Sequence, residues 1–203
     1  MRMKRAALMI ENRREGGVAM RRMMLGSAVL MAAVLTPSPA FAQSDVATVV
    51  SAEEIQTVVS APGGGDREVR ILDLGKFNLG VAVLRRAATR PGAPMAGINH
   101  TKLTEVYYVV SGSGTFISGG DIENVRALAA DSELVTTVVG PGNNATFKKP
   151  AQIRKVSAGD VIVVPAGVYH GFSEVPDHIE YVLVRPDVEK VLPAGYVNPT
   201  LKK

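Results

Sequence analysis

The sequence predicts an all-β fold, an antiparallel sandwich or barrel, with one short helix ahead of it. From Arg67 onward, short runs rich in β-branched and aromatic residues alternate with turn-forming residues, which is typical of many short strands. The runs are 67–74, 79–87, 104–110, 114–118, 145–150, 161–167, 169–175 and 179–186. Turns such as Gly-Ser-Gly and Gly-Pro-Gly-Asn-Asn separate them. With 203 residues, the chain is long enough for one such domain and short for two.

The predicted helix lies at residues 51–61. Ser51 begins it and Glu54 follows three residues later, which is the spacing of a capping box. Residues 121–143 interrupt the strands, and we expect a brief helix at 122–132. The expected organisation is a leader at 1–42, a helix and linker at 43–66, a barrel at 67–186 and a C-terminal tail at 187–203.

Residues 1–42 are typical of an export signal. Arg21 and Arg22 precede an apolar run at 23–35, and small residues then predict cleavage before Gln43. The run has 13 residues, whereas a membrane span needs about 20. We therefore expect a periplasmic or secreted protein whose mature form has no membrane span.

Alternatives remain within this leader. Residues 1–19 mix acids and bases ahead of the signal, so Met20 or Met23 is an alternative start. The arginine pair also allows a twin-arginine signal, although an ordinary secretory signal fits at least as well. An uncleaved membrane anchor is the alternative to a signal peptide.

The basic character of the chain belongs to the leader. The whole chain has a formal charge of +4, and seven of its 23 Lys/Arg but only two of its 19 Asp/Glu lie in residues 1–42. The remainder carries 16 bases against 17 acids. A body without a basic excess gives no electrostatic reason to expect nucleic acid as a partner.

Three residues of the strand region combine two imidazoles and one carboxylate: His100, Glu105 and His170. Such a set suits a divalent transition metal (Mn, Fe, Ni, Cu or Zn) and leaves positions open for water or substrate. Because alternate residues of a strand share a face, His100 and Glu105 point the same way only if the chain bends or bulges between them. Spacing alone leaves their convergence open.

The segment GDVIVVPAGVYHGFSE resembles the second motif of the cupin family, G-x5-P-x-G-x2-H-x3-N. Gly159, Pro165, Gly167 and His170 fall at the required positions, and Glu174 replaces the final Asn. This match of spacing and residue type is specific.

The segment GAPMAGINHTKLTEVYYVVSG is similar to the first cupin motif, G-x5-H-x-H-x3,4-E-x6-G. Gly92, His100, Glu105 and Gly112 are in register, with His100 as the second histidine, and Ile98 stands in place of the first. Taking His100 as the first histidine instead shortens the spacer and loses the leading glycine, so we prefer the former register.

The resemblance covers roughly residues 67–186 and implies a single-domain jelly-roll barrel (a double-stranded β-helix) of two antiparallel sheets. It also implies a metal held inside by His100, Glu105 and His170, and a cavity for a small ligand. Ile98 cannot be a ligand, but three protein ligands with water can hold a divalent metal. The alternative is a degenerate site in which His and Glu only share hydrogen bonds.

Four more side chains are candidates for lining that cavity: Tyr107, Phe172, Glu174 and Lys102. Alternation puts Phe172 and Glu174 on the face of His170. It also puts Tyr107 on the face of Glu105, and it puts Lys102 on the face of His100 if the strand is regular there. Their plainer roles are core packing for the aromatic residues and a solvated rim for the charged ones.

Two functions remain open, because cupins include enzymes of several classes and non-catalytic proteins. One is a metal-dependent enzyme acting on a small polar molecule, and the other is an exported protein that binds a small ligand or a metal. An arginine facing inward would select a carboxylate or a phosphate, but the sequence does not fix how Arg70, Arg85 and Arg86 face. A homodimer is a further expectation for the chain.

Overall fold

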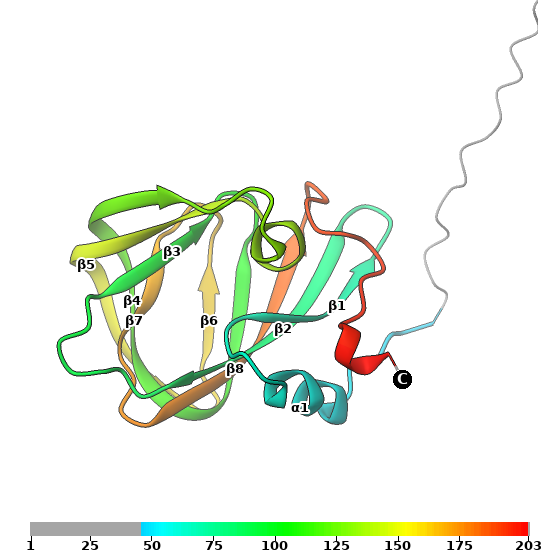
Figure 1. Ribbon diagram of the computed structural model, residues 1–203, viewed down its shortest axis with the longest axis horizontal. Coiled ribbons are helices and arrows are strands. Elements are labelled where there is room, and N and C mark those ends of the chain that lie inside the picture. Colours follow the sequence, from blue (N-terminus) through cyan, green and yellow to red (C-terminus); the bar gives the residue numbers. More distant parts are fainter. Residues whose placement is uncertain (1–45, 203) are drawn as a thin grey trace, which may run out of the picture. The chain divides into compact units, whose positions relative to one another are not determined.

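The structure, a computed structural model, describes residues 46–202. The signal peptide predicted for residues 1–42 lies outside the described residues. The elements, in chain order (Figure 1), are α1 (Ala52–Ser60), β1 (Arg67–Asp73), β2 (Asn78–Ala87), β3 (Ala96–His100), β4 (Glu105–Ala127), a π-helical turn η1 (Leu134–Val139), β5 (Gly142–Ser157), β6 (Val161–Val164), β7 (His170–Glu174), β8 (His178–Asp187) and a 3₁₀ turn η2 (Pro199–Leu201). Within the described part, no helix is long and apolar enough to cross a membrane.

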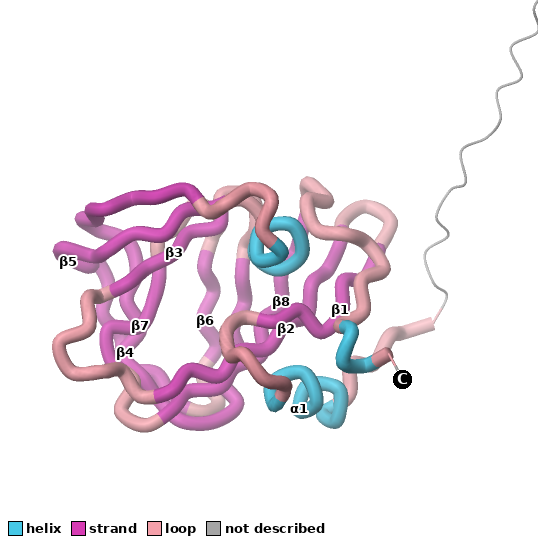
Figure 2. The backbone as a smooth tube through the Cα atoms, in the orientation of Figure 1, coloured by secondary structure: helices cyan, strands magenta, loops and turns pink. Residues whose placement is uncertain are grey.

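The strands, magenta in Figure 2, pair in two antiparallel sheets that share β4. The first sheet has the order β1-β2-β8-β4-β6. The second contains β4, β5, β3 and β7, and β7 pairs back with β4. The predicted all-β jelly-roll barrel with a short N-terminal helix is therefore confirmed.

Helix α1 has the predicted capping box. The Oγ of Ser51 accepts a hydrogen bond from the N–H of Glu54 at 3.2 Å, and Oε2 of Glu54 accepts one from the N–H of Ser51 at 2.9 Å. Val58 of the helix is fully buried against Val69 and Val83. The helix thus covers the outer face of β1 and β2, and leaves the barrel interior to the strands.

Strand β4 is longer than the sequence predicts. The Gly-Ser-Gly segment was expected as a turn, but it is a bend inside the strand, and Gly112 has φ +73°. A Cβ at Gly112 would lie 2.0 Å from the carbonyl oxygen of His178, so only glycine allows β8 to approach this closely.

The brief helix predicted at 122–132 is wrong. Ile122 pairs with Phe147 of β5 in the second sheet, and the strand continues to Ala127. Asn124 has φ +54°, which interrupts the ladder and is incompatible with a helix. Pairing with β5 therefore overrides the local helix pattern, and the helical turn η1 comes later in the chain.

Aromatic side chains fill the barrel beside the predicted ligands. The rings of Tyr107 and Tyr181 stack with centroids 4.7 Å apart. Phe116 packs edge-on against Phe172, with centroids 5.4 Å apart, and also lies 6.3 Å from the ring of His170. Buried aromatic rings contribute much of the apolar area of a core, so this cluster fixes the walls around His170.

Candidate metal centre

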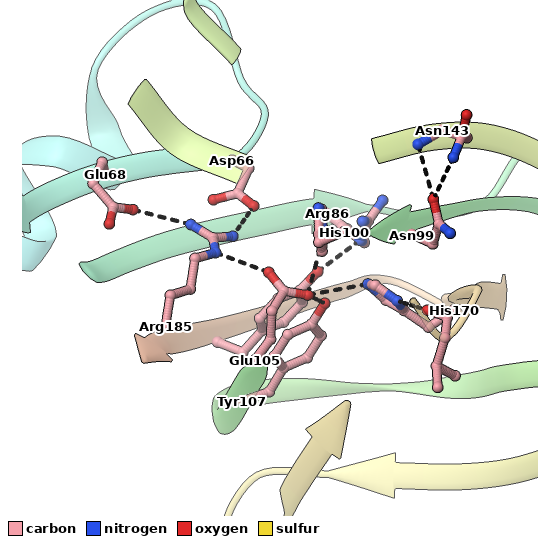
Figure 3. A network of polar contacts seen from close by, with 12 residues as sticks. Asp66, Glu68, Arg86, Asn99, His100, Glu105, Tyr107, Asn143, His170 and Arg185 are labelled. Carbon is pink, nitrogen blue, oxygen red and sulfur yellow. Dashed lines mark hydrogen bonds and ion pairs between the residues drawn. The ribbon is translucent and has the colours of Figure 1, made fainter. Parts of the chain in front are cut away.

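His100, Glu105 and His170 converge inside the barrel, as Figure 3 shows. Oε2 of Glu105 lies 3.2 Å from Nε2 of His100 and 3.1 Å from Nε2 of His170. The three ligand atoms all lie within 4.8 Å of one another, and each residue is at most 3% exposed. The structure thus brings together the three residues that the sequence predicts as metal ligands.

A break between two strands allows His100 and Glu105 to face the same way, although alternation along a single strand would turn them to opposite faces. Strand β3 ends at His100, residues 101–104 are irregular, and β4 begins at Glu105. His100 pairs with Gly142 in the second sheet, whereas Glu105 pairs with Val164 in the first. The chain passes from one sheet to the other between the two ligands, so both side chains point inward.

A backbone carbonyl orients His170. Its Nδ1 lies 3.0 Å from the carbonyl oxygen of Val168, and because a carbonyl can only accept, Nδ1 carries the hydrogen. Nε2 of the same ring faces the carboxylate oxygen of Glu105 at 3.1 Å. Two lone pairs would repel each other at that distance, so Nε2 either donates a proton to Glu105 or shares a metal ion with it.

His100 is held less firmly. Its Nδ1 is buried and has no hydrogen-bond partner among the described residues, so its ring is fixed through Nε2 alone. Metal-binding histidines commonly donate their other N–H to a carbonyl or carboxylate. The structure provides that partner for His170 and not for His100.

Glu105 is held as a carboxylate from both sides. Its Oε2 accepts from the hydroxyl of Tyr107 at 2.8 Å, and its Oε1 accepts from Nε of Arg185 at 2.8 Å. Burial raises the pKa of Glu105, but the charge of Arg185 and the hydrogen bonds from the two histidines outweigh burial and hold this pKa well below its usual value. At neutral pH the residue is therefore an oriented anion.

Arg185 is the centre of a buried cluster that the sequence analysis missed. It is 0% exposed and binds Asp66, Glu68 (2.9 Å) and Glu105 (2.8 Å). Burial raises the pKa of Glu68 to about 8, because Arg185 offsets burial only in part and Asp66 adds a like charge. One guanidinium thus serves three carboxylates, and Glu68 is the one that keeps its proton at neutral pH.

The sequence did contain a signal for Arg185. Alternation along β8 places it on the same face as Tyr181 and Leu183, which are both buried. An arginine in phase with buried residues needs buried carboxylates. Glu68 and Asp66, near the start of β1, supply two of them from a distant part of the chain.

Ile98 lies where the first cupin motif would place a further histidine. It pairs directly with His170 across β3 and β7, so their side chains share a face of the second sheet. Ile98 is half-buried and offers no donor atom to a metal.

A cavity of about 240 Å³ adjoins His170. It is lined by Arg86, Pro94, Ala96, Gly97, Ile98, Asn144, His170, Gly171 and Phe172. Of the four predicted cavity residues, Phe172 lies in this lining. Tyr107 is 4% exposed and belongs to the aromatic core, where it orients Glu105.

The structure does not bring Glu174 or Lys102 to this cavity. Phe172 and Glu174 pair with consecutive residues of β4, which leaves Ser173 as an extra residue and turns Glu174 to the exposed side. Lys102 lies in the irregular segment after β3, and its Nζ is 2.8 Å from Glu189 at the surface. In both cases an irregularity in the strand cancels the alternation on which the prediction depended.

The three residues fit a divalent metal by their donor atoms and spacing. Metal–ligand bonds of about 2.0–2.2 Å place two neighbouring ligand atoms about 3–4 Å apart, and the contacts of Glu105 with the histidines are 3.2 and 3.1 Å. Two imidazole nitrogens and one carboxylate oxygen suit several transition metals.

The comparison with protein families agrees with this architecture. A family model described as Cupin matches residues 51–187, more than half of the chain. The chain belongs to the cupin family. A cupin barrel with His and Glu side chains turned inward is what the two sequence motifs predicted.

Solved structures similar to this cupin have low sequence identity to it. A Bacillus halodurans protein is 15% identical, with a TM-score of 0.44 over 76% of this chain and 91% of its own. The DMSP lyase DddQ of Ruegeria pomeroyi is 13% identical, with a TM-score of 0.37 over 69% of this chain and 54% of its own. An 11S globulin of Wrightia tinctoria is 14% identical, with a TM-score of 0.39 over 70% and 29%. Such scores carry no argument about activity. Comparison with curated protein sequences gives no match.

Proposed function

We propose that this cupin binds a divalent transition metal through His100, Glu105 and His170 and is a metal-dependent enzyme acting on a small polar molecule. The observation that carries the proposal is the convergence of two imidazole nitrogens on one carboxylate oxygen: Oε2 of Glu105 lies 3.2 Å from Nε2 of His100 and 3.1 Å from Nε2 of His170. One metal ion can accept a lone pair from each of these three atoms, whereas without it each imidazole must donate a separate proton to the same oxygen.

The chain's own residues prepare the ligands for this role. Val168 holds the tautomer and plane of His170, while Tyr107 and Arg185 hold the carboxylate of Glu105 from opposite sides. These contacts leave the ligands little freedom to lose on binding, which strengthens metal affinity. When bound, the metal would supply a Lewis acid or an oxygen-activating centre.

The cavity supports a small polar molecule as the reaction partner. His170 lies in its lining, so a molecule in the cavity is next to one ligand of the proposed metal. Its volume of about 240 Å³ is below the usual range of about 300–1,000 Å³ for drug-sized ligands. A molecule of a few carbon atoms is the size that this space accepts.

A non-catalytic binding protein is the second candidate, and one observation favours it. Among the cavity-lining residues of the described structure there is one histidine, His170, and no aspartate or glutamate, and His170 is a proposed ligand. The nearby carboxylates Asp66, Glu68 and Glu105 all bind Arg185. Proton transfer would therefore depend on the metal site itself.

The metal proposal is tested by elemental analysis of the purified protein and its variants. We expect wild type to bind one divalent ion per chain and His170→Ala to lose it, with affinity falling about 100-fold or more, because two remaining ligands compete poorly with water. Glu105→Gln should weaken binding less, since an amide oxygen still coordinates without charge. His178→Ala is the matched control, because His178 pairs with Asp177 outside the site.

Circular dichroism of the same proteins distinguishes loss of metal from loss of fold. Wild-type protein that stays metal-free after incubation with Mn, Fe, Ni, Cu and Zn would overturn the proposal. A metal-loaded protein that turns over a co-purifying molecule, and stops when chelator is added, supports the enzyme. Tight binding of that molecule without turnover supports the binding protein instead.

Export and association with a second copy are also proposals. We infer from the leader that the mature protein begins near Gln43 and is periplasmic or secreted, and intact mass of exported material tests this. A mass that retains the apolar run at 23–35 would indicate an anchor. Sedimentation analysis tests for the homodimer.

A further inference from the structure

Arg86 is the strand arginine that faces the barrel interior at the cavity. It follows Ala82 and Leu84, both buried, in the alternation of β2. It pairs with Ile179, which is fully buried, whereas Arg85 pairs with Glu180 on the other face and forms an ion pair with it at 3.2 Å. The two adjacent arginines therefore belong to opposite sides of the sheet.

Two aromatic residues hold the Arg86 side chain. Its Nε donates a hydrogen bond to the hydroxyl of Tyr181 at 2.9 Å, and its Cζ lies 5.6 Å from the ring centroid of Phe172. Both aromatic residues belong to the packed core. The guanidinium is thus oriented in advance, while Nη1 and Nη2 have no hydrogen-bond acceptor among the described residues.

Arg86 forms no ion pair with a carboxylate in the described part of the chain. By contrast, Arg70 pairs with Glu54, Arg85 pairs with Glu180, and Arg185 pairs with three acids. Arg86 lies in the cavity lining and remains exposed there. An oriented cation with two free donors beside a cavity is a complementary site for an anion.

The rest of the lining favours a carboxylate over a phosphate. Besides Arg86 and His170, Asn144 is the polar side chain of this lining, and the lining contains no lysine, serine or threonine. A phosphate presents several charged oxygens that need donors from several directions, whereas a carboxylate is satisfied by the two parallel N–H groups of one guanidinium.

We propose that this cavity binds a small molecule through a carboxylate group, which pairs with the two terminal nitrogens of Arg86. The rest of the molecule extends toward His170. This inference rests on the proposed function, which makes this cavity the place where the substrate binds. Arg86 itself requires no metal to bind an anion. It therefore narrows the substrate class to small carboxylic acids.

Calorimetric titration with malonate and pyruvate as probes tests this inference. Malonamide, which has the size of malonate without its charge, and inorganic phosphate complete the set. We expect saturable binding of at least one acid, at least tenfold weaker binding in Arg86→Met, and unchanged binding in Arg85→Met. Arg86→Lys should recover only part of the affinity, since an ammonium group lacks the paired donors.

Each titration is run with protein in chelator and with protein incubated with Zn²⁺, so that two failures can be told apart. Acid binding that depends on Arg86 in both samples supports the inference even if no metal binds. Metal binding without Arg86-dependent acid binding leaves the proposed metal site intact and overturns the inference. Equal binding of malonamide, tighter binding of phosphate than of either acid, or equal affinity of wild type and Arg86→Met would also overturn it.

Discussion

Arg185 and Arg86 lie on neighbouring strands and both face the barrel interior, yet their surroundings are opposite. Arg185 is fully buried and binds the carboxylates of Asp66, Glu68 and Glu105. Arg86 binds a tyrosine hydroxyl and an aromatic ring, and makes no ion pair within the described structure. Within the described residues, Arg185 has more carboxylates than it can neutralise, whereas Arg86 forms an ion pair with none.

This difference distinguishes an arginine whose charge pairs with carboxylates of the chain, Arg185, from one whose charge can bind a ligand, Arg86. The Arg185 cluster fixes Glu105 as an oriented carboxylate, and each of the three guanidinium nitrogens already donates to a carboxylate of the chain. The Arg86 side chain is oriented equally well but keeps two donors free beside the cavity. In this barrel the supply of carboxylates, rather than the facing of the arginine, decides which one can recognise a ligand.

The largest expected effect is that of Arg185→Met. It leaves buried carboxylates without a counter-charge, which typically costs about 3–5 kcal/mol. We expect that loss in the free energy of unfolding, measured by denaturant titration at neutral pH. Arg86→Met is the control and should cost about 1 kcal/mol or less, since it removes one hydrogen bond and one cation–π contact. Equal losses in the two variants would remove the distinction between the two arginines.

The next effect concerns the pH dependence of stability. Burial raises the pKa of Glu68 to about 8 from an ordinary 4.5, so between these values the folded protein holds a proton that the unfolded chain has lost. The stabilising contribution is complete below pH 4.5 and is lost as pH rises through 8, at about 1.4 kcal/mol per pH unit for one proton. Glu68→Gln removes this dependence.

We compare the free energy of unfolding of Glu68→Gln with that of wild type at each pH. Between pH 5 and pH 8 this difference should shift by about 2–4 kcal/mol in favour of the variant. Denaturant titrations at the two pH values measure this difference. Glu174→Gln is the control, because Glu174 is exposed. Parallel curves for wild type and Glu68→Gln would mean that Arg185 keeps all three carboxylates ionised.

The smallest expected effect is a gain. Ile98 pairs with His170 across two strands, so Ile98→His would add an imidazole on the face of an existing ligand. We expect metal affinity to rise about tenfold or more, as a fourth protein ligand replaces water. Competition with a coloured chelator measures it, with Ile98→Val as the control. Unchanged affinity would show that the metal lies away from β3.

The sequence predicted much of the fold because its signals are local. Alternation and turn residues indicated the strands, and Ser51 with Glu54 indicated the capping box. The motif spacings selected His100, Glu105 and His170, which the structure brings together. A turn or a motif is specified within a few residues, so it can be recognised without knowledge of distant contacts.

Only the tertiary structure decided which way side chains face and which charged groups form ion pairs. Each bulge or break reverses the parity of the residues after it, so Ser173 turned Glu174 outward and the break after His100 removed Lys102 from the cavity. Pairing with β5 made a strand of residues that resemble a helix. The sequence by itself determined which residues can bind a metal. Long-range pairing decided that Arg185 forms ion pairs with three carboxylates and that Arg86 forms none with the residues the structure describes, because a buried charge takes its partners from strands far apart in the chain.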